Sequence, residues 1–226
     1  MRGGFAPAGA KPPGTLAPIA RVARVQLRPT IVAVVGIDGT GKSTQTGLLA
    51  DSLRRDGIPA SSFENPGGRP WLNALAVRLG RRDGQDLVGR RAVVVLETAI
   101  RVAAITRALV IARLTGQVAV MDRYSVCQFA MMRARGDRGE RVVRRIFGVF
   151  PDPDVTVLLE APALVAQRRV DLRGKDHEDI DYLRALDAAY RSLPEAGSFV
   201  ELDAGGTIDD VQRALRGAVN VQLGLA

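Results

Sequence analysis

The sequence contains a single cysteine and a single histidine. One cysteine, Cys127, excludes a disulfide within the chain and is typical of a protein in a reducing compartment. One histidine, His177, excludes a metal centre built from several histidines. The chain also lacks any uninterrupted apolar stretch of roughly 18 residues and any apolar signal segment near its amino terminus, so we expect a cytoplasmic protein that does not enter the membrane.

Lysine is scarce as well, since the chain has three lysines among its 32 basic residues. One of them, Lys42, lies in the segment Gly36–Thr44, which has the sequence Gly-Ile-Asp-Gly-Thr-Gly-Lys-Ser-Thr. This segment is a complete G-x-x-x-x-G-K-S phosphate-binding loop, a pattern that arises by chance in roughly one such chain in several hundred. The apolar residues 31–35 precede it and the helix-like residues 43–55 follow it. The sequence therefore predicts a nucleotide phosphate site.

The residue types of this loop suit the binding of phosphate. Glycines at 36, 39 and 41 allow backbone N–H groups to turn inward around phosphate oxygens. The positive end of the following helix points at the same place. Lys42 is expected to reach the β- and γ-phosphates of ATP, and the hydroxyl of Ser43 to bind Mg²⁺. The predicted ATP-binding residues are Gly36, Gly39, Thr40, Gly41, Lys42, Ser43 and Thr44.

The formal net charge of +8 is distributed unevenly. Residues 1–29 contain five basic residues and no acidic ones, and they are rich in proline, glycine and alanine. We expect this segment to be a disordered tail. It lacks the series of aromatic residues on which single-strand binders stack bases, so a nucleic acid partner is not expected. The remaining charge suits a protein that binds polyphosphates.

Short apolar segments alternate with helix-like segments along the rest of the chain. This alternation predicts an α/β protein of the three-layer P-loop NTPase type, with a five-stranded parallel sheet, helices on both faces and a helical lid. We expect one domain over 30–222, with the lid at about 168–180. The expected strands are 31–35, 58–63, 117–121, 155–159 and 199–202. The expected helices are 70–81, 87–115, 126–135, 141–150, 162–172, 179–193 and 208–219.

Charged residues follow the predicted strands where ligands of parallel sheets bind. Asp122 follows four apolar residues and is expected to hold Mg²⁺ together with Ser43, while Arg123 would reach a second anionic group. At the end of another strand, Glu64 is a candidate general base and Arg69 a candidate phosphate ligand; solvated turn residues are the alternative. Phosphoryl transfer also needs cations around the phosphoryl group that is transferred. Three arginines of the expected lid could supply them: Arg168, Arg169 and Arg173.

These motifs resemble the thymidylate kinase family of nucleoside monophosphate kinases over residues 30–218. The segment from Gly36 to Gln45, with an acid at Asp38, is similar to the phosphate loop of that family. Asp122-Arg123-Tyr124 is similar to its Asp-Arg-Tyr/His signature, and Pro66-Gly67-Gly68 to its second turn. The resemblance implies an enzyme that uses ATP and Mg²⁺ to phosphorylate dTMP and that forms a homodimer.

The resemblance also implies an acceptor site. Arg101 lies where the family has the arginine that contacts the thymine base, and Tyr190 lies near the tyrosine below that base. The family's stacking aromatic is replaced by Glu97, whose carboxylate would suit a base with exocyclic N–H donors. Met131 and Met132 also depart from the family pattern. The expected acceptor-site residues are Asp38, Glu64, Arg69, Glu97, Arg101, Arg123, Tyr124, Gln128 and Tyr190.

The sequence leaves three functions open. The first is a nucleoside monophosphate kinase, most simply of dTMP, with Lys42, Asp122, Arg123 and the lid arginines as catalytic residues. The second is a kinase of a hydroxyl group, such as that of a deoxynucleoside, with Glu64 as the base. The third is a nucleotide-binding module without an acceptor site of its own. The acceptor base, the sugar preference, the oligomeric state and the role of the tail are not specified by the sequence.

Overall fold

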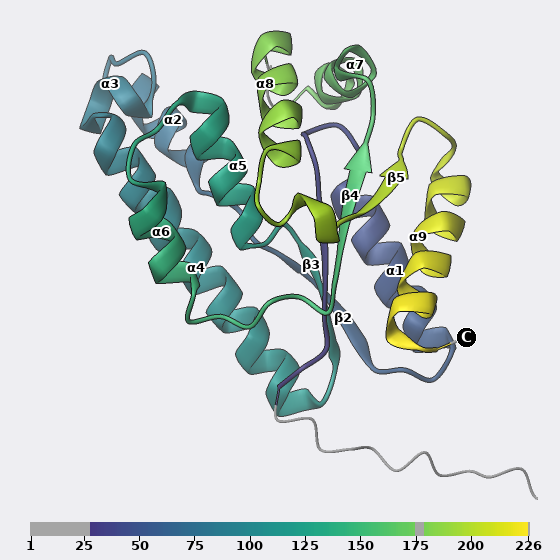
Figure 1. Cartoon of the computed structure of the whole chain (residues 1–226). Coiled ribbons are helices and arrows are strands. Elements are labelled where there is room, and N and C mark those ends of the chain that lie inside the picture. The colour runs from purple at the N-terminus through teal and green to yellow at the C-terminus, as the bar shows by residue number, and fades with distance from the viewer. Residues whose placement is uncertain (1–27, 175–178, 226) are drawn as a thin grey trace, which may run out of the picture.

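A parallel β-sheet forms the centre of the computed structural model, which describes residues 28–174 and 179–225 (Figure 1). Its strand order is β2-β3-β1-β4-β5, and every pair of neighbouring strands is parallel. The prediction of a five-stranded parallel sheet is confirmed. The strands are β1 (Ile31–Val35), β2 (Ala60–Glu64), β3 (Val118–Asp122), β4 (Val155–Glu160) and β5 (Val200–Asp203).

Helices cover both faces of this sheet and bury two apolar layers. All five residues of β1 are fully buried, and they alternate between the layers as the pleat of a strand requires. Val32 and Val34 pack with helices α1 and α9, whereas Ile31, Ala33 and Val35 belong to the layer under α4, α5 and α8. The three-layer arrangement is visible in Figure 1.

The helices follow the predicted positions with one correction. A single helix over 87–115 was predicted, but the chain forms two helices there, which are separated at Gly89. Gly89 has a φ of 82°, in a region that other residues rarely adopt, and so the helix cannot continue through it. The helices are α1 (Lys42–Arg55), α2 (Arg69–Arg78), α3 (Gly84–Val88), α4 (Arg90–Thr115), α5 (Ser125–Arg135), α6 (Glu140–Phe147), α7 (Ala163–Arg173), α8 (Ile180–Arg191), the 3₁₀ turn η1 (Ala196–Ser198) and α9 (Ile208–Leu223).

The first described residue, Arg28, is attached to the domain. Its guanidinium forms an ion pair with Asp154, with 2.8 Å between Nη2 and Oδ1, and the same carboxylate accepts the backbone N–H of Ile31 at 2.8 Å. The carboxyl end of the segment predicted as a tail is therefore fixed beside β1. Residues 1–27 and the lid residues 175–178 lie outside the described ranges. No helix within those ranges is long and apolar enough to span a bilayer.

Candidate active site

The phosphate loop connects β1 to α1 at the carboxyl edge of the sheet. Gly36, Gly39 and Gly41 have φ angles of 137°, 91° and 89°, which glycine adopts without strain. A Cβ atom at Gly36 or Gly39 would also collide with the backbone of Leu159 or Ala166. The first two glycines are thus required by both conformation and space, and Gly41 by conformation alone.

Lys42 is buried inside this loop. Its ammonium donates to the carbonyl of Ile37 at 2.7 Å and contacts Oδ1 of Asp38 at 3.3 Å. Burial lowers the pKa of Lys42 and the charge of Arg123 adds to this effect, while Asp38 and Asp122 oppose it. The ammonium is therefore held where a phosphate bound in the loop would lie.

Ser43 and Asp122 meet across the sheet edge. The hydroxyl of Ser43, in the first turn of α1, donates to Oδ2 of Asp122 at 2.5 Å. Asp122 is the last residue of β3, and it is paired in register with Val34 of β1. Its second carboxylate oxygen is buried and has no hydrogen-bond partner among the described residues. The two predicted metal ligands thus lie together, and one oxygen remains available for an ion or an ordered water.

Arg123 and Asp38 form an ion pair directly above the strand ends. Burial lowers the pKa of Arg123, but Asp38 and the neighbouring Cys127, Tyr190 and Asp122 together outweigh burial, so the pKa is raised above its usual range. Burial raises the pKa of Asp38, yet the charges of Arg123 and Lys42 outweigh this effect and hold the pKa well below its usual range. Asp38 therefore stays ionised at neutral pH and orients both cations.

The backbone at Arg123 is strained. Its φ of 72° is the only positive value at a non-glycine residue in the described ranges, a conformation that costs of order 1–3 kcal/mol. Two hydrogen bonds hold it: the N–H of Arg123 donates to Val34 at 3.0 Å, and its carbonyl accepts the side-chain amide of Asn65 at 2.6 Å. The strained backbone directs the side chain of Arg123 toward the phosphate loop.

Asn65 is a site residue that the sequence reasoning did not select. It is 1% exposed and follows β2, with its backbone N–H donating to the carbonyl of Asp122 at 3.1 Å. Its own carbonyl accepts Nη1 of Arg101 at 3.1 Å. Asn65 therefore links the metal-side residues Asp122 and Arg123 to an arginine of the expected acceptor side. Its position directly before Pro66 at a strand end was the signal that could have identified it.

Arg101 and Gln128 form the buried floor of the expected acceptor side. Arg101 is 1% exposed, its Nε donates to the side-chain carbonyl of Gln128 at 3.3 Å, and burial lowers its pKa. The side-chain nitrogen of Gln128 is buried without a partner among the described residues. A Cβ atom at Gly67 would lie 3.1 Å from Nη2 of Arg101, so glycine lets the second turn approach the guanidinium. This floor offers hydrogen-bond donors to a planar polar group.

Glu97 is paired with an arginine of α5. Both of its carboxylate oxygens accept Nη1 of Arg135, at 3.1 and 3.0 Å, and both side chains are more than nine-tenths buried. The carboxylate is therefore neutralised by Arg135, and its contact with exocyclic N–H groups of a base stays a prediction. Removing one member of such a buried pair typically costs about 3–5 kcal/mol. The partners lie on α4 and α5, too far apart in sequence for a local pattern to reveal them.

The two predicted tyrosines lie in different places. Tyr190 is fully buried beneath the phosphate loop, with its hydroxyl 3.5 Å from the carbonyl of Gly36. Burial and then the neighbouring Cys127 raise its pKa well above the usual range. Tyr124 instead donates to the carbonyl of Pro151 at 2.8 Å, which holds the start of α5 against the segment before β4. The contacts of Tyr124 are thus structural.

The remaining predicted residues lie on β2, α2 and α7. Glu64 is exposed and pairs in register with Asp122, and Arg69 begins α2. Arg168 and Arg173 are exposed on α7. Arg169 instead donates to the carbonyls of Ala204 at 2.8 Å and Gly205 at 3.5 Å. Its contacts hold the turn between β5 and α9.

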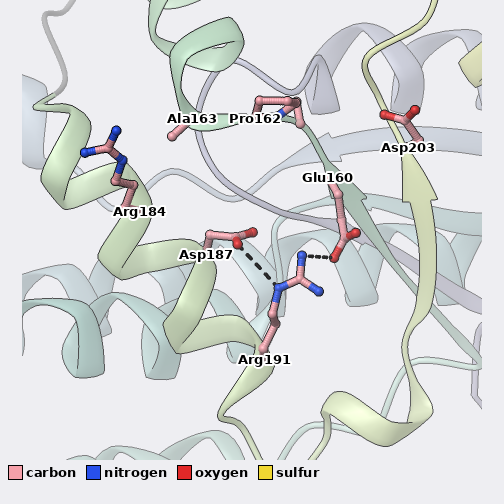
Figure 2. Close-up of a pocket in the computed structure, with 8 residues that line it drawn as sticks. Glu160, Pro162, Ala163, Arg184, Asp187, Arg191 and Asp203 are labelled. Atoms are coloured by element: carbon pink, nitrogen blue, oxygen red, sulfur yellow. Dashed lines mark hydrogen bonds and ion pairs between the residues drawn. The ribbon is translucent and has the colours of Figure 1, made fainter.

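A separate charged pocket of about 470 Å³ lies at the ends of β4 and β5, beside α7 and α8 (Figure 2). Arg191 forms ion pairs with Glu160 at 2.7 Å and with Asp187 at 3.4 Å. Burial raises the pKa of Glu160, and Arg191 opposes that shift. None of the predicted site residues lines the pocket, so we assign the chemistry to the phosphate-loop edge instead.

Comparison with known proteins identifies relatives of this chain. Residues 34–215 match the family profile described as thymidylate kinase. The chain is 27% identical over 201 residues to a probable thymidylate kinase of Archaeoglobus fulgidus, covering 86% of this chain and 97% of the relative. It is 28% identical to the thymidylate kinase of Rhodopirellula baltica, covering 82% and 78%. It is 26% identical to that of Fervidobacterium nodosum, covering 85% and 99%.

Proposed function

This chain belongs to the thymidylate kinase family, whose reaction is the ATP-dependent phosphorylation of dTMP to dTDP, and we propose how its own residues carry out that reaction. The observation that carries the assignment of roles is the joint placement of Lys42, Asp38, Arg123 and Asp122 at one sheet edge. In this arrangement two cations and two carboxylates alternate around the phosphate loop. Positioning and charge stabilisation are the main demands of phosphoryl transfer.

On the donor side, ATP binds along Gly36–Thr44. The inward-facing N–H groups and the amino terminus of α1 hold its phosphates. Lys42 exchanges its contacts with Ile37 and Asp38 for the β- and γ-phosphates. Since that ammonium is already buried, it needs little further desolvation when the nucleotide binds.

Ser43 and Asp122 fit a Mg²⁺ site. A hydroxyl and a carboxylate are the oxygen ligands that this ion prefers, and Asp122 has one buried oxygen without a partner among the described residues. The described part of the chain includes no cluster of three or more acidic, cysteine or histidine side chains able to hold a metal. An ion here would therefore complete its shell with phosphate oxygens and water. When bound, it neutralises charge that develops on the transferring group.

On the acceptor side, Arg101 and Gln128 contact the base, and Arg123 binds the phosphate of dTMP. This assignment is supported by the buried hydrogen-bond network that joins Arg101 to Asn65 and Asn65 to Arg123. Asp38 orients Arg123 and lies near the acceptor sugar. The acceptor phosphate is already an anion, so no general base is required. Arg69 and Tyr190 complete the surroundings of the acceptor.

We assign the lid to about residues 168–180 of a domain over 30–222, and a tail to 1–29; residues 175–178 and 1–27 of these segments lie outside the described ranges. Arg168 and Arg173 close over the γ-phosphate, which their exposure on α7 permits. Arg169 is assigned instead to the β5–α9 turn. The enzyme works in the cytoplasm, where its nucleotide substrates are made and used.

A screen of phosphate acceptors tests the assigned reaction. ATP consumption is measured against nucleosides and nucleoside monophosphates, with Lys42→Ala as the background. We expect dTMP to give the highest kcat/KM. Turnover of no monophosphate above the Lys42→Ala background would contradict the assignment.

Replacing Glu64 by glutamine is expected to leave kcat for dTMP within about threefold of wild type, because an anionic acceptor needs no proton removed. The carboxylate is also exposed and forms no hydrogen bond or ion pair with residues 28–174 or 179–225. Steady-state kinetics with dTMP and with thymidine check this result. Loss of nearly all turnover with intact ATP binding would indicate a hydroxyl acceptor and Glu64 as its base.

The homodimer is supported by an exposed stripe along α4. Residues spaced three or four apart, on one helical face, are exposed although they are apolar or small. Leu114 is 80% exposed and Val110 49%. Such a stripe suits close packing against a second helix. The stripe consists of Ala99, Ala103, Thr106, Val110 and Leu114.

Replacing Ala103 by arginine, within the stripe, is expected to convert the dimer to a monomer, since each subunit would bring an added charge into the interface. Sedimentation velocity measures the oligomeric state. Val221→Arg, at an exposed position on α9, is the control and should remain dimeric. A dimer that persists in Ala103→Arg at low micromolar concentration would place the interface elsewhere.

A further inference from the structure

A groove of about 700 Å³ lies away from the phosphate loop, where the start of α4 meets the turn between α5 and α6. In Figure 1 these elements lie together on the α4 side of the sheet. Its apolar floor is formed by Val94 and Val95 of α4 and by Val142 and Val143 of α6. Val95 is 68% exposed and Val142 57%, so an apolar ligand would remove both from water.

The rim of the groove is cationic. Arg91 and Arg138 are exposed there, and neither forms an ion pair within the part of the chain that the structure describes. The third rim cation, Arg90, is paired with Asp137 at 2.5 Å. Helices α4 and α6 also begin at this place, after Gly89 and Gly139, and neither has a side-chain cap. Their free backbone N–H groups add to the positive field.

From these features we propose that the groove is a second ligand site, which binds a small organic anion with an apolar body. The anionic group lies at the rim, among Arg90, Arg91 and Arg138, and the apolar body covers the four valines. The chemical class includes aryl and acyl phosphates, sulfonates and carboxylates. A purely inorganic anion would leave the valine floor exposed, and a neutral apolar molecule would leave the arginines without a counter-charge.

A chain of alternating charges connects this groove to the acceptor side. Arg90 contacts Asp137, Asp137 lies 3.8 Å from Nε of Arg135, and Arg135 holds Glu97. The side chains of Asp137, Arg135 and Glu97 are all more than nine-tenths buried. Glu97 in turn lies beside Gly67 and the floor that contains Arg101. An anion at the rim competes with Asp137 for Arg90 and so alters the support of Glu97. This step rests on the proposed acceptor site.

Binding is tested with anilinonaphthalene sulfonate, whose fluorescence rises when its aromatic body leaves water. The titration uses the full chain with saturating ATP, which occupies the phosphate loop. We expect Val142→Glu and the pair Arg91→Gln/Arg138→Gln each to weaken binding at least tenfold. Val221→Glu and Arg213→Gln, exposed positions on α9, are the matched controls and should bind as wild type does.

The outcomes separate the groove from the proposed function. Equal affinity in wild type and groove variants, or probe binding that is seen without ATP and lost at saturating ATP, would overturn the second site whatever the enzyme phosphorylates. If the groove binds the probe, the KM for dTMP should change at least twofold at saturating probe, and this change should vanish in Val142→Glu. An unchanged KM would overturn the coupling while leaving the site. Circular dichroism melts establish that each variant is folded.

Discussion

Replacing Arg123 by alanine is expected to lower kcat for dTMP phosphorylation by about 10³-fold, because removal of a preorganised cation from a buried transferring site has effects of this size. Arg123 combines a strained backbone with an ion pair to Asp38, so its guanidinium is positioned before any substrate arrives. Its loss also leaves the Asp38 carboxylate with Lys42 as its nearest cation. Steady-state kinetics with dTMP measure the effect.

Two further variants interpret this result. Arg123→Lys keeps the charge but loses the planar fork, and it should recover about tenfold or less of the lost kcat. Arg123→Gly removes the same side chain without the backbone strain, so equal kcat in the alanine and glycine variants assigns the loss to the guanidinium. Retention of more than a tenth of wild-type kcat in Arg123→Ala would refute a catalytic role.

Replacing Asp122 by asparagine is expected to lower kcat by about 10²-fold or more at physiological Mg²⁺ and to raise the Mg²⁺ concentration needed for half-maximal rate. The neutral amide keeps the shape of the carboxylate but removes the charge that attracts the ion. It also changes the partner that accepts the hydroxyl of Ser43. Rates measured over a Mg²⁺ titration at saturating ATP and dTMP check both expectations.

Asp187→Asn is the control for this prediction, since Asp187 lies on α8 in the separate charged pocket. It should leave the Mg²⁺ dependence unchanged. An Asp122→Asn enzyme with the same half-saturating Mg²⁺ concentration as wild type would show that Asp122 does not support the ion. In that case its hydrogen bond with Ser43 would serve to position α1 alone.

The features that could be predicted from the sequence are those that depend on short, continuous segments of the chain. The phosphate loop is a contiguous motif, and β1 and β3 are buried on both faces, so they appear as apolar segments that end in functional residues. Asp122 could be placed beside Ser43 because parallel strands present their carboxyl ends at one edge. Once the strands were recognised, the parallel topology therefore predicted that these residues lie at the same edge of the sheet.

The features that the sequence did not predict depend on contacts between distant segments. Glu97 meets Arg135 only because α4 and α5 pack together, and Arg169 is directed to the β5–α9 turn by the tertiary position of α7. The role of Asn65 likewise follows from the approach of β2 to β3. In each case the side chain type permitted several partners, and the fold selected one of them.

Asn65 also affects how this site ages. Asparagine side chains deamidate when the backbone nitrogen of the next residue attacks the amide, and the next residue here is Pro66, which has no backbone N–H. The product of deamidation would place a carboxylate against the carbonyl of Arg123, where the amide now donates. The proline therefore protects the buried amide of Asn65, which joins the two halves of the site, from deamidation by this route.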